Sequence, residues 1–451
     1  MKDVVVLLPG ILGSALEKDG STLWDTNASA IGHALLTLGH SVQALALKGN
    51  GTSGEGVTAT RLLDDVHLVP FFWKIDGYSG LARYLQEKLA LAPGEDFFEF
   101  PYDWRLDNRV SARRLAEQAA EWLARKRRKE PEAKLVLVGH SMGGLVARYF
   151  IEVLGGWRDT RTLVTLGTPH RGSVKALDFL ANGLNKKLGP VTLLDLSHLI
   201  QTLPSVYQLL PIYPCVGTSA DKLVSLETLN RPAIGQLDLA RARAGIEFHR
   251  EIERAVESNR ANKGYGYRIV PFVGAYQPTF LSALLTPDGV APLGTYDGQS
   301  TLEGDGTVPR FSATPIELSS ANAESYVACP HASLQNFDPV RVQLRAVLED
   351  VDISQLKAVG AGAIAMSLPD AAITGVPVPV RARCAEAAKP VEARLVHLET
   401  QTVTEKEFSM PIPPETWQTL ELSSLVPGTY RLRVSADDAA EPIEDVFVVL
   451  P

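Results

Sequence analysis

Cysteine is scarce in this chain of 451 residues. The three cysteines, Cys215, Cys329 and Cys384, are far apart in sequence and show no C-x-x-C spacing. We therefore expect neither a disulfide framework nor a cysteine-based zinc site, and the sequence predicts no metal and no cofactor. Reduced thiols are typical of the cytoplasm, so the expected location is cytoplasmic.

Long hydrophobic runs are absent as well. No stretch approaches the roughly 20 apolar residues that a membrane-spanning helix needs. The N-terminal run Val4–Leu8 is interrupted by Pro9-Gly10 and is shorter than the about 7–15 residues of a secretory signal. It is interpreted as a buried strand.

Positive charge is in the minority, with 44 basic against 52 acidic residues and a net charge of −8. Nucleic-acid binding needs a concentrated basic surface, so no nucleic acid is expected as a partner. The basic run 125–129 closes an amphipathic helix, where cations complement the helix dipole. Transient contact with an anionic membrane surface is the alternative interpretation of that run.

Strand and helix patterns alternate through the first half of the chain. The strands are expected at Val4–Leu8, Phe97–Tyr102, Lys134–Gly139 and Arg161–Gly167, and the helices at Arg109–Lys129 and Gly143–Leu154. Such alternation predicts an α/β fold with a mostly parallel sheet and helices on both faces. Ligands of such sheets bind at the carboxyl ends of the strands.

The alternation breaks in two places, which we interpret as cap or lid insertions at about 25–80 and 171–264. The second is expected to be helical, with helices at Ala176–Leu188 and Glu247–Ala261. Strand patterns resume at Tyr267–Ala275 and Glu324–Cys329, and the helix Pro339–Asp350 closes a first domain predicted to span residues 1–355.

After about residue 362 the sequence pattern changes to short strand-like runs separated by turn residues. Tyr430, Leu432 and Val434 alternate with polar residues, which is typical of a half-buried strand. About 90 residues of this kind predict a small all-β domain, an immunoglobulin-like β-sandwich over residues 362–451. The role we consider for this domain is binding of a protein partner.

Gly139-His140-Ser141-Met142-Gly143 matches the motif G-x-S-x-G between a predicted strand and a predicted helix. A tight strand-to-helix turn lifts the serine hydroxyl above the sheet, and small flanking residues avoid clashes there. Ser141 is therefore the candidate nucleophile of an α/β-hydrolase fold. The N–H of Met142 is a candidate donor to the oxyanion.

A serine needs a base, and in this fold class the acid and then the base follow the serine in the chain. Asp305, in a Gly-Asp-Gly turn, is the candidate acid, with Asp288 and Asp297 as alternatives. His331 follows the last predicted strand and is the candidate base, whereas His170 precedes the acid. The second oxyanion donor is expected from the loop after the first strand, at Ile11, with Leu12 as the alternative.

Five features occur in order along the chain: L-P-G-I-L-G-S (8–14), P-Y-D-W-R (101–105), G-H-S-M-G-G (139–144), G-D-G-T-V-P (304–309) and His331. Together they resemble the lecithin:cholesterol acyltransferase family of α/β-hydrolases, which includes lysosomal phospholipases and plant phospholipid:diacylglycerol acyltransferases. The resemblance implies a triad of Ser141, Asp305 and His331 and an oxyanion hole at residue 11 and Met142. It also implies a lipid acyl ester as substrate.

The candidate substrate contacts are Leu12, Phe72, Trp73 and His140. The segment 71–78 falls where the family has an aromatic lid, although a buried aromatic cluster would look the same. His140 adjoins the serine, but packing is its simpler role, because adjacent side chains on a turn diverge.

The function these features predict is serine-dependent hydrolysis of a lipid acyl ester through an acyl-serine. Transfer of the acyl group to a lipid alcohol is left open, because the acceptor depends on how well the site excludes water. The alternative is a catalytically inactive hydrolase fold that recruits a protein partner through the C-terminal domain.

Overall fold

Six parallel strands form the central sheet, in the spatial order β19-β16-β9-β8-β1-β7. The computed structural model describes residues 1–25, 44–64, 66–69, 73–188, 191–296, 302–318, 325–350, 363–369, 371–385, 391–407, 414, 416–436 and 442–450. The sheet strands are β1 (Val4–Leu8), β7 (Phe97–Glu99), β8 (Leu135–His140), β9 (Thr160–Leu166), β16 (Arg268–Gly274) and β19 (Ser325–Val327). All residues of β1 and β8 are buried, as expected for strands covered on both faces.

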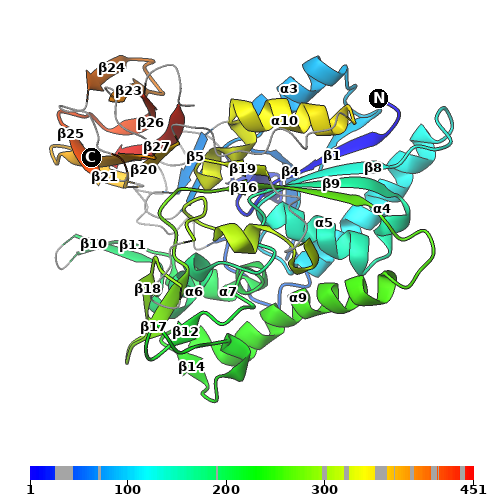
Figure 1. Ribbon diagram of the computed structural model, residues 1–451, viewed down its shortest axis with the longest axis horizontal. Coiled ribbons are helices and arrows are strands. Elements are labelled where there is room, and N and C mark those ends of the chain that lie inside the picture. The colour runs from blue at the N-terminus through cyan, green and yellow to red at the C-terminus, as the bar shows by residue number, and fades with distance from the viewer. Residues whose placement is uncertain are drawn as a thin grey trace.

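Helices cover both faces of this sheet (Figure 1). On one face α3 (Ser79–Leu89) and α10 (Asp338–Leu348) lie side by side, and on the other lie α4 (Asn108–Lys126) and α5 (Met142–Glu152). The long helix α9 (Leu239–Asn259) packs against α5, whose residues are all buried. The 3-10 helices are η1 (Gly156–Arg158), η2 (Leu226–Thr228), η3 (Arg310–Ala313), η4 (Ile316–Leu318) and η5 (His331–Asn336). The predicted fold class is confirmed by this architecture.

The second insertion contains the expected helices and, in addition, short strands that the sequence pattern did not indicate. Its elements before α9 are α6 (Val174–Asn182), β10 (Asn185–Leu188), β11 (Val191–Asp195), α7 (Ser197–Thr202), α8 (Pro204–Tyr207), β12 (Val216–Gly217), β13 (Leu223–Val224), β14 (Ala233–Ile234) and β15 (Leu237–Asp238). The helix expected at Ala176–Leu188 ends at Asn182, because Gly183 at φ +80° leaves the helical conformation. Two later strands, β17 (Ser282–Leu285) and β18 (Val290–Leu293), join β12 and β13 in one sheet.

The first insertion is also built from strands where it is described. It holds β4 (Val57–Leu62), β5 (Val66–Val69) and β6 (Trp73–Asp76). The hairpin β2 (Ser14–Lys18) and β3 (Ser21–Trp24) pairs with β4. Residues 26–43 lie outside the described residues.

Two further sheets follow residue 362. One contains β20 (Ile364–Ser367), β22 (Val378–Cys384) and β25 (Gln418–Leu422), and the other contains β21 (Ala371–Ile373), β23 (Val391–His397), β24 (Val403–Glu407), β26 (Gly428–Ala436) and β27 (Ile443–Leu450). Val380 of the first sheet and Leu432 and Phe447 of the second belong to one hydrophobic cluster. The two sheets therefore share a core, while the domain limits 1–355 and 362–451 stay predictions.

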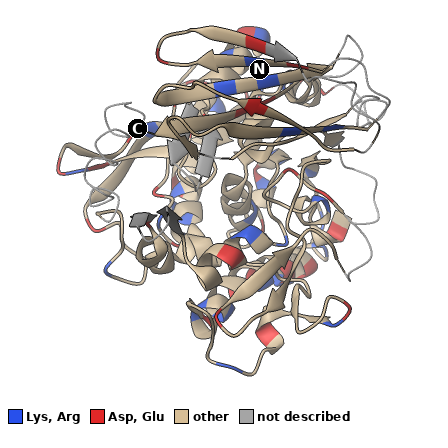
Figure 2. Cartoon of the chain, turned by 90° about the vertical axis from the view of Figure 1, so that its left-hand side faces the viewer, with Lys and Arg blue, Asp and Glu red and all other residues tan. Residues whose placement is uncertain are grey.

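Acidic and basic residues are interspersed over the chain (Figure 2). Among the described residues, no helix combines the length and the apolar character needed to cross a bilayer.

Candidate active site

Ser141 sits on the turn between β8 and α5 with φ +51° and ψ −124°. An L-residue in this region carries a backbone strain of about 1–3 kcal/mol, which the surrounding structure must offset. The Ser141 N–H donates to the carbonyl of Leu166 on the neighbouring strand (2.9 Å), and the Ser141 carbonyl accepts from the Gly144 N–H (3.1 Å). The turn therefore holds the hydroxyl at the carboxyl end of the sheet, where the motif predicts it.

The glycines of the motif are required by close backbone contacts. A Cβ on Gly143 would lie 2.4 Å from the carbonyl oxygen of Pro9, and a Cβ on Gly139 would lie 2.6 Å from the Cα of Gly144. These neighbours are backbone atoms that cannot rotate away. The first strand's loop and the serine turn therefore pack backbone against backbone.

The base and the acid meet the serine in the predicted order. His331 Nε2 lies 2.9 Å from Ser141 Oγ, and His331 Nδ1 lies 2.7 Å from Asp305 Oδ2. The His331 N–H also donates to the Asp305 carbonyl (2.8 Å). The orientation of the imidazole is thus fixed by the hydrogen bond of the His331 backbone N–H as well as by those of the ring nitrogens.

Asp305 is almost completely buried, at 2% exposure. Its Oδ1 accepts hydrogen bonds from the N–H groups of Thr307 (2.9 Å) and Val308 (2.7 Å). Backbone donors of this kind stabilise a buried carboxylate, which leaves Oδ2 for the imidazole. The Gly-Asp-Gly turn therefore presents one oxygen in a fixed direction.

His140 lies behind the triad with both ring nitrogens engaged. Its Nε2 contacts the carbonyl oxygen of His331 (3.0 Å) and its Nδ1 contacts Tyr78 Oη (2.8 Å). Burial lowers the pKa of His140 to about 3, so the ring is neutral and carries one proton. Since a carbonyl only accepts, that proton is on Nε2 and the Tyr78 hydroxyl donates to Nδ1. His140 thus joins Tyr78 to the backbone of His331 by hydrogen bonds, and its predicted substrate contact gains no support.

Tyr78 also fixes the loop after β1, because its hydroxyl oxygen accepts the Gly10 N–H (2.7 Å). Gly10 passes directly against the nucleophile: an added Cβ would lie 3.0 Å from Ser141 Cβ. Within the part of the chain that the structure describes, neither the Ile11 nor the Met142 N–H donates to a protein acceptor. Both amides are available for the oxyanion role that the sequence predicts.

The P-Y-D-W-R block explains the position of the same loop. Tyr102 Oη donates to the Pro9 carbonyl (2.8 Å), and Trp104 Nε1 donates to the Ser14 carbonyl (3.2 Å). The buried pair Asp103–Arg105 (2.7 Å) holds the block itself. In the sequence, this block is recognised only through the family resemblance. The structure shows that the block holds the loop after β1. The same role of Tyr78 was not predicted from the sequence.

The remaining candidates are placed as follows. Leu12 is buried at φ +64°, and its carbonyl accepts from Trp24 Nε1. Phe72 lies outside the described residues, and Trp73 is described only as part of β6. The alternative base His170 is buried, and its Nε2 contacts Thr165 Oγ1 (3.4 Å), whereas Ser141 and Asp305 are joined by His331. Of the alternative acids, Asp288 lies in the β17–β18 turn and Asp297 lies outside the described residues.

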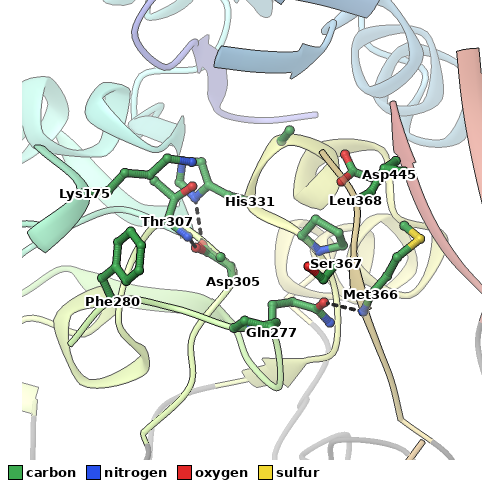
Figure 3. A pocket seen from close by; sticks show the side chains of 14 residues that line it. Lys175, Gln277, Phe280, Asp305, Thr307, His331, Met366, Ser367, Leu368 and Asp445 are labelled. Atoms are coloured by element: carbon green, nitrogen blue, oxygen red, sulfur yellow. Dashed lines mark hydrogen bonds and ion pairs between the residues drawn. The ribbon is translucent and has the colours of Figure 1, made fainter. Parts of the chain in front are cut away.

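A pocket of about 300 Å³ adjoins the acid and the base (Figure 3). Its wall includes Asp305 and His331 on one side and Met366 and Leu368 of the C-terminal region on the other. Ser141 is not part of the wall, so this pocket borders the triad from the side of Asp305. In the described residues, no group of three or more His, Cys, Asp or Glu side chains is placed to hold a metal ion.

A parallel sheet with a serine on a strained strand-to-helix turn, followed in the chain by an aspartate and a histidine that join it, defines an α/β-hydrolase. A chain in the crystal structure of the Tle4–Tli4 complex has a similar fold, with a TM-score of 0.50 and 17% identity. The similarity covers 79% of this chain and 99% of that one.

The chain is similar to the lecithin:cholesterol acyltransferase family, whose model matches residues 56–230. Over 145 residues it is 33% identical to the lysosomal phospholipase A and acyltransferase of Homo sapiens, covering 30% of this chain and 33% of that protein. Over 89 residues it is 35% identical to the phosphatidylcholine-sterol acyltransferase of Gallus gallus, covering 19% and 21%. The aligned regions thus span a third or less of these relatives, and they confirm the resemblance that the motifs indicate.

Proposed function

We propose that this protein is a serine-dependent lipid acyl-ester hydrolase that works through an acyl-serine intermediate. The observation that carries the proposal is the hydrogen-bonded series Ser141, His331 and Asp305. Ser141 Oγ lies 2.9 Å from His331 Nε2, and His331 Nδ1 lies 2.7 Å from Asp305 Oδ2. The lipid character of the substrate is supported by the two relatives, whose names describe a phospholipase and acyltransferase and a sterol acyltransferase.

In the proposed reaction, His331 Nε2 takes the proton of Ser141 as the hydroxyl oxygen attacks the ester carbonyl. Asp305 orients the imidazole and stabilises its charged form. The developing oxyanion is bound by the N–H groups of Ile11 and Met142, each worth about 3 kcal/mol of transition-state stabilisation. His331 then returns the proton to the leaving alcohol, and an acyl-serine remains.

Water or a lipid alcohol resolves the acyl-serine, with His331 again as the base. Hydrolysis is the outcome we propose, and acyl transfer requires an acceptor that reaches His331 before water does. Contact with a membrane surface and a protein partner for the C-terminal region remain predictions. A cytoplasmic location also remains a prediction, and the human relative is named as a lysosomal protein.

The proposal is tested by acid release from medium- and long-chain acyl esters, measured with and without an added lipid alcohol. Ser141→Ala removes the nucleophile and is expected to lower kcat by at least about 1,000-fold. Ser53→Ala, in an exposed glycine-rich loop, is the control and should match the wild type. Equal acid release by wild type and Ser141→Ala contradicts the serine mechanism, and an inactive wild type favours the interaction protein.

A further inference from the structure

The turn that carries Asp305 rests on the segment 277–279. The Gln277 N–H donates to the Gly304 carbonyl (2.9 Å), and Thr279 Oγ1 accepts the N–H groups of Gly304 (3.0 Å) and Gly306 (2.9 Å). The Thr279 hydroxyl in turn donates to the Gln277 carbonyl (2.7 Å). The position of the acid therefore depends on where Gln277 and Thr279 are held.

Gln277 is held by the C-terminal region. Its side chain is 2% exposed, its Nε2 donates to the Ile364 carbonyl (3.1 Å) and its Oε1 accepts the Met366 N–H (3.1 Å). The amide thus pairs with the edge of β20 as a neighbouring peptide group would. Figure 3 shows this bond from Gln277 to Met366 as a dashed line.

A second contact holds the neighbouring residues. Arg383 of β22 forms an ion pair with Glu303, which directly precedes the Gly304-Asp305 turn. The same guanidinium lies 4.4 Å from the ring centre of Tyr276, which adopts φ +67°. Strands β20 and β22 of one C-terminal sheet therefore hold both the start of the supporting segment, at Gln277, and the residue that precedes the turn of the acid, Glu303.

We propose that Gln277 is a positioning residue for Asp305, and that through it the C-terminal β region keeps the acid in register with His331. The inference rests on the function proposed above and gives the C-terminal region a role in the reaction rather than in recruitment. Gln277 touches neither substrate nor the reacting atoms. Its effect reaches them through the 304–306 turn, and small displacements of a catalytic group have large effects on rate.

The test compares Gln277→Ala with Gln208→Ala in the full-length chain. Gln208 is an equally buried glutamine, and its side chain also makes two hydrogen bonds, to the Asn108 N–H (2.9 Å) and Asp107 Oδ1 (2.8 Å), at the start of α4. Each variant loses the two hydrogen bonds of a buried glutamine, so Gln208→Ala is the control for a general loss of stability. Readouts are kcat and KM for an acyl ester, the pH dependence of kcat/KM, and the thermal unfolding temperature.

We expect Gln277→Ala to lower kcat by about 10- to 100-fold with little change in KM. The acid limb of its pH profile should move to lower pH, because a displaced carboxylate stabilises the imidazolium less. Gln208→Ala should keep the wild-type kcat and acid limb. Should Gln277→Ala fail to fold, Gln277→Met keeps most of the side-chain volume but makes neither hydrogen bond to β20, and it should change kcat and the acid limb in the same direction.

A Gln277 variant that loses stability as Gln208→Ala does, but keeps the wild-type kcat and acid limb, overturns the positioning role while leaving the proposed function intact. A wild type that releases no acid from any ester overturns both.

Discussion

At the scale of single residues, one tyrosine links the two halves of the proposed site. Tyr78 Oη accepts the Gly10 N–H and donates to His140 Nδ1, and His140 donates to the carbonyl of His331. A buried series of hydrogen bonds therefore joins the base, His331, to the loop after β1 that is expected to bind the oxyanion. Burial raises the pKa of Tyr78 well above its usual value, so the phenol keeps its proton.

Tyr78→Phe should lower kcat by about tenfold with little change in KM, because Gly10 then loses the acceptor that holds the loop beside Ser141. The buried Gly10 N–H and His140 Nδ1 would be left without partners, at a cost of about 1–3 kcal/mol each. Steady-state kinetics and thermal unfolding measure the two effects. Tyr149→Phe, which loses a hydrogen bond to Glu251, is the control. Wild-type kcat in Tyr78→Phe would show that the loop is held without it.

At the scale of elements, the sequence predicts those whose pattern is local. The limits of β1 match the prediction, and α4 and α5 differ from it by a few residues at their ends. The triad could also be predicted, because G-x-S-x-G and the chain order of acid and base are properties of the backbone turn and the fold.

Other elements depend on contacts that no local pattern records. The hairpin β10–β11 follows Gly183, where an apolar helical pattern appeared to continue. Tyr78 and Gln277 each act through partners distant in sequence: His140 for Tyr78, Ile364 and Met366 for Gln277. Their roles follow from tertiary packing and were missed by sequence reasoning.

At the scale of the whole molecule, buried histidines tie stability to pH. Burial lowers the pKa of His140 to about 3 and that of His249 to about 4, and it lowers the pKa of His170 well below its ordinary value. In the unfolded chain these groups take up protons near pH 6.5. Between that pH and the folded pKa, the unfolded state binds more protons, so each histidine lowers the free energy of unfolding as the pH falls.

Buried carboxyl groups oppose this trend. Burial raises the pKa of Asp76 to about 6, although its partner Arg431, at 2.8 Å, acts in the other direction. Asp76 then holds a proton that the unfolded chain releases, so its contribution to stability grows as the pH falls from about 6 to 3.8. The contribution of one histidine to the pH dependence of the free energy of unfolding is therefore best isolated by substituting that histidine.

His249→Gln should reduce the loss of unfolding free energy between pH 7.5 and 5 by about 2 kcal/mol. The glutamine amide can still donate to the Gln208 carbonyl, as His249 Nε2 does at 2.7 Å. Chemical denaturation at the two pH values measures the difference. His198→Gln, at an exposed position, should leave the pH dependence unchanged, and an unchanged dependence in His249→Gln would contradict the linkage.

The central claim is that Ser141 is a nucleophile activated by His331, and a fluorophosphonate probe tests it most directly. Mass spectrometry of the labelled chain should locate the phosphonyl group on Ser141, and His331→Ala should slow labelling by at least about 100-fold. A wild type that acquires no label at Ser141, or a His331→Ala variant labelled at the wild-type rate, would contradict the account.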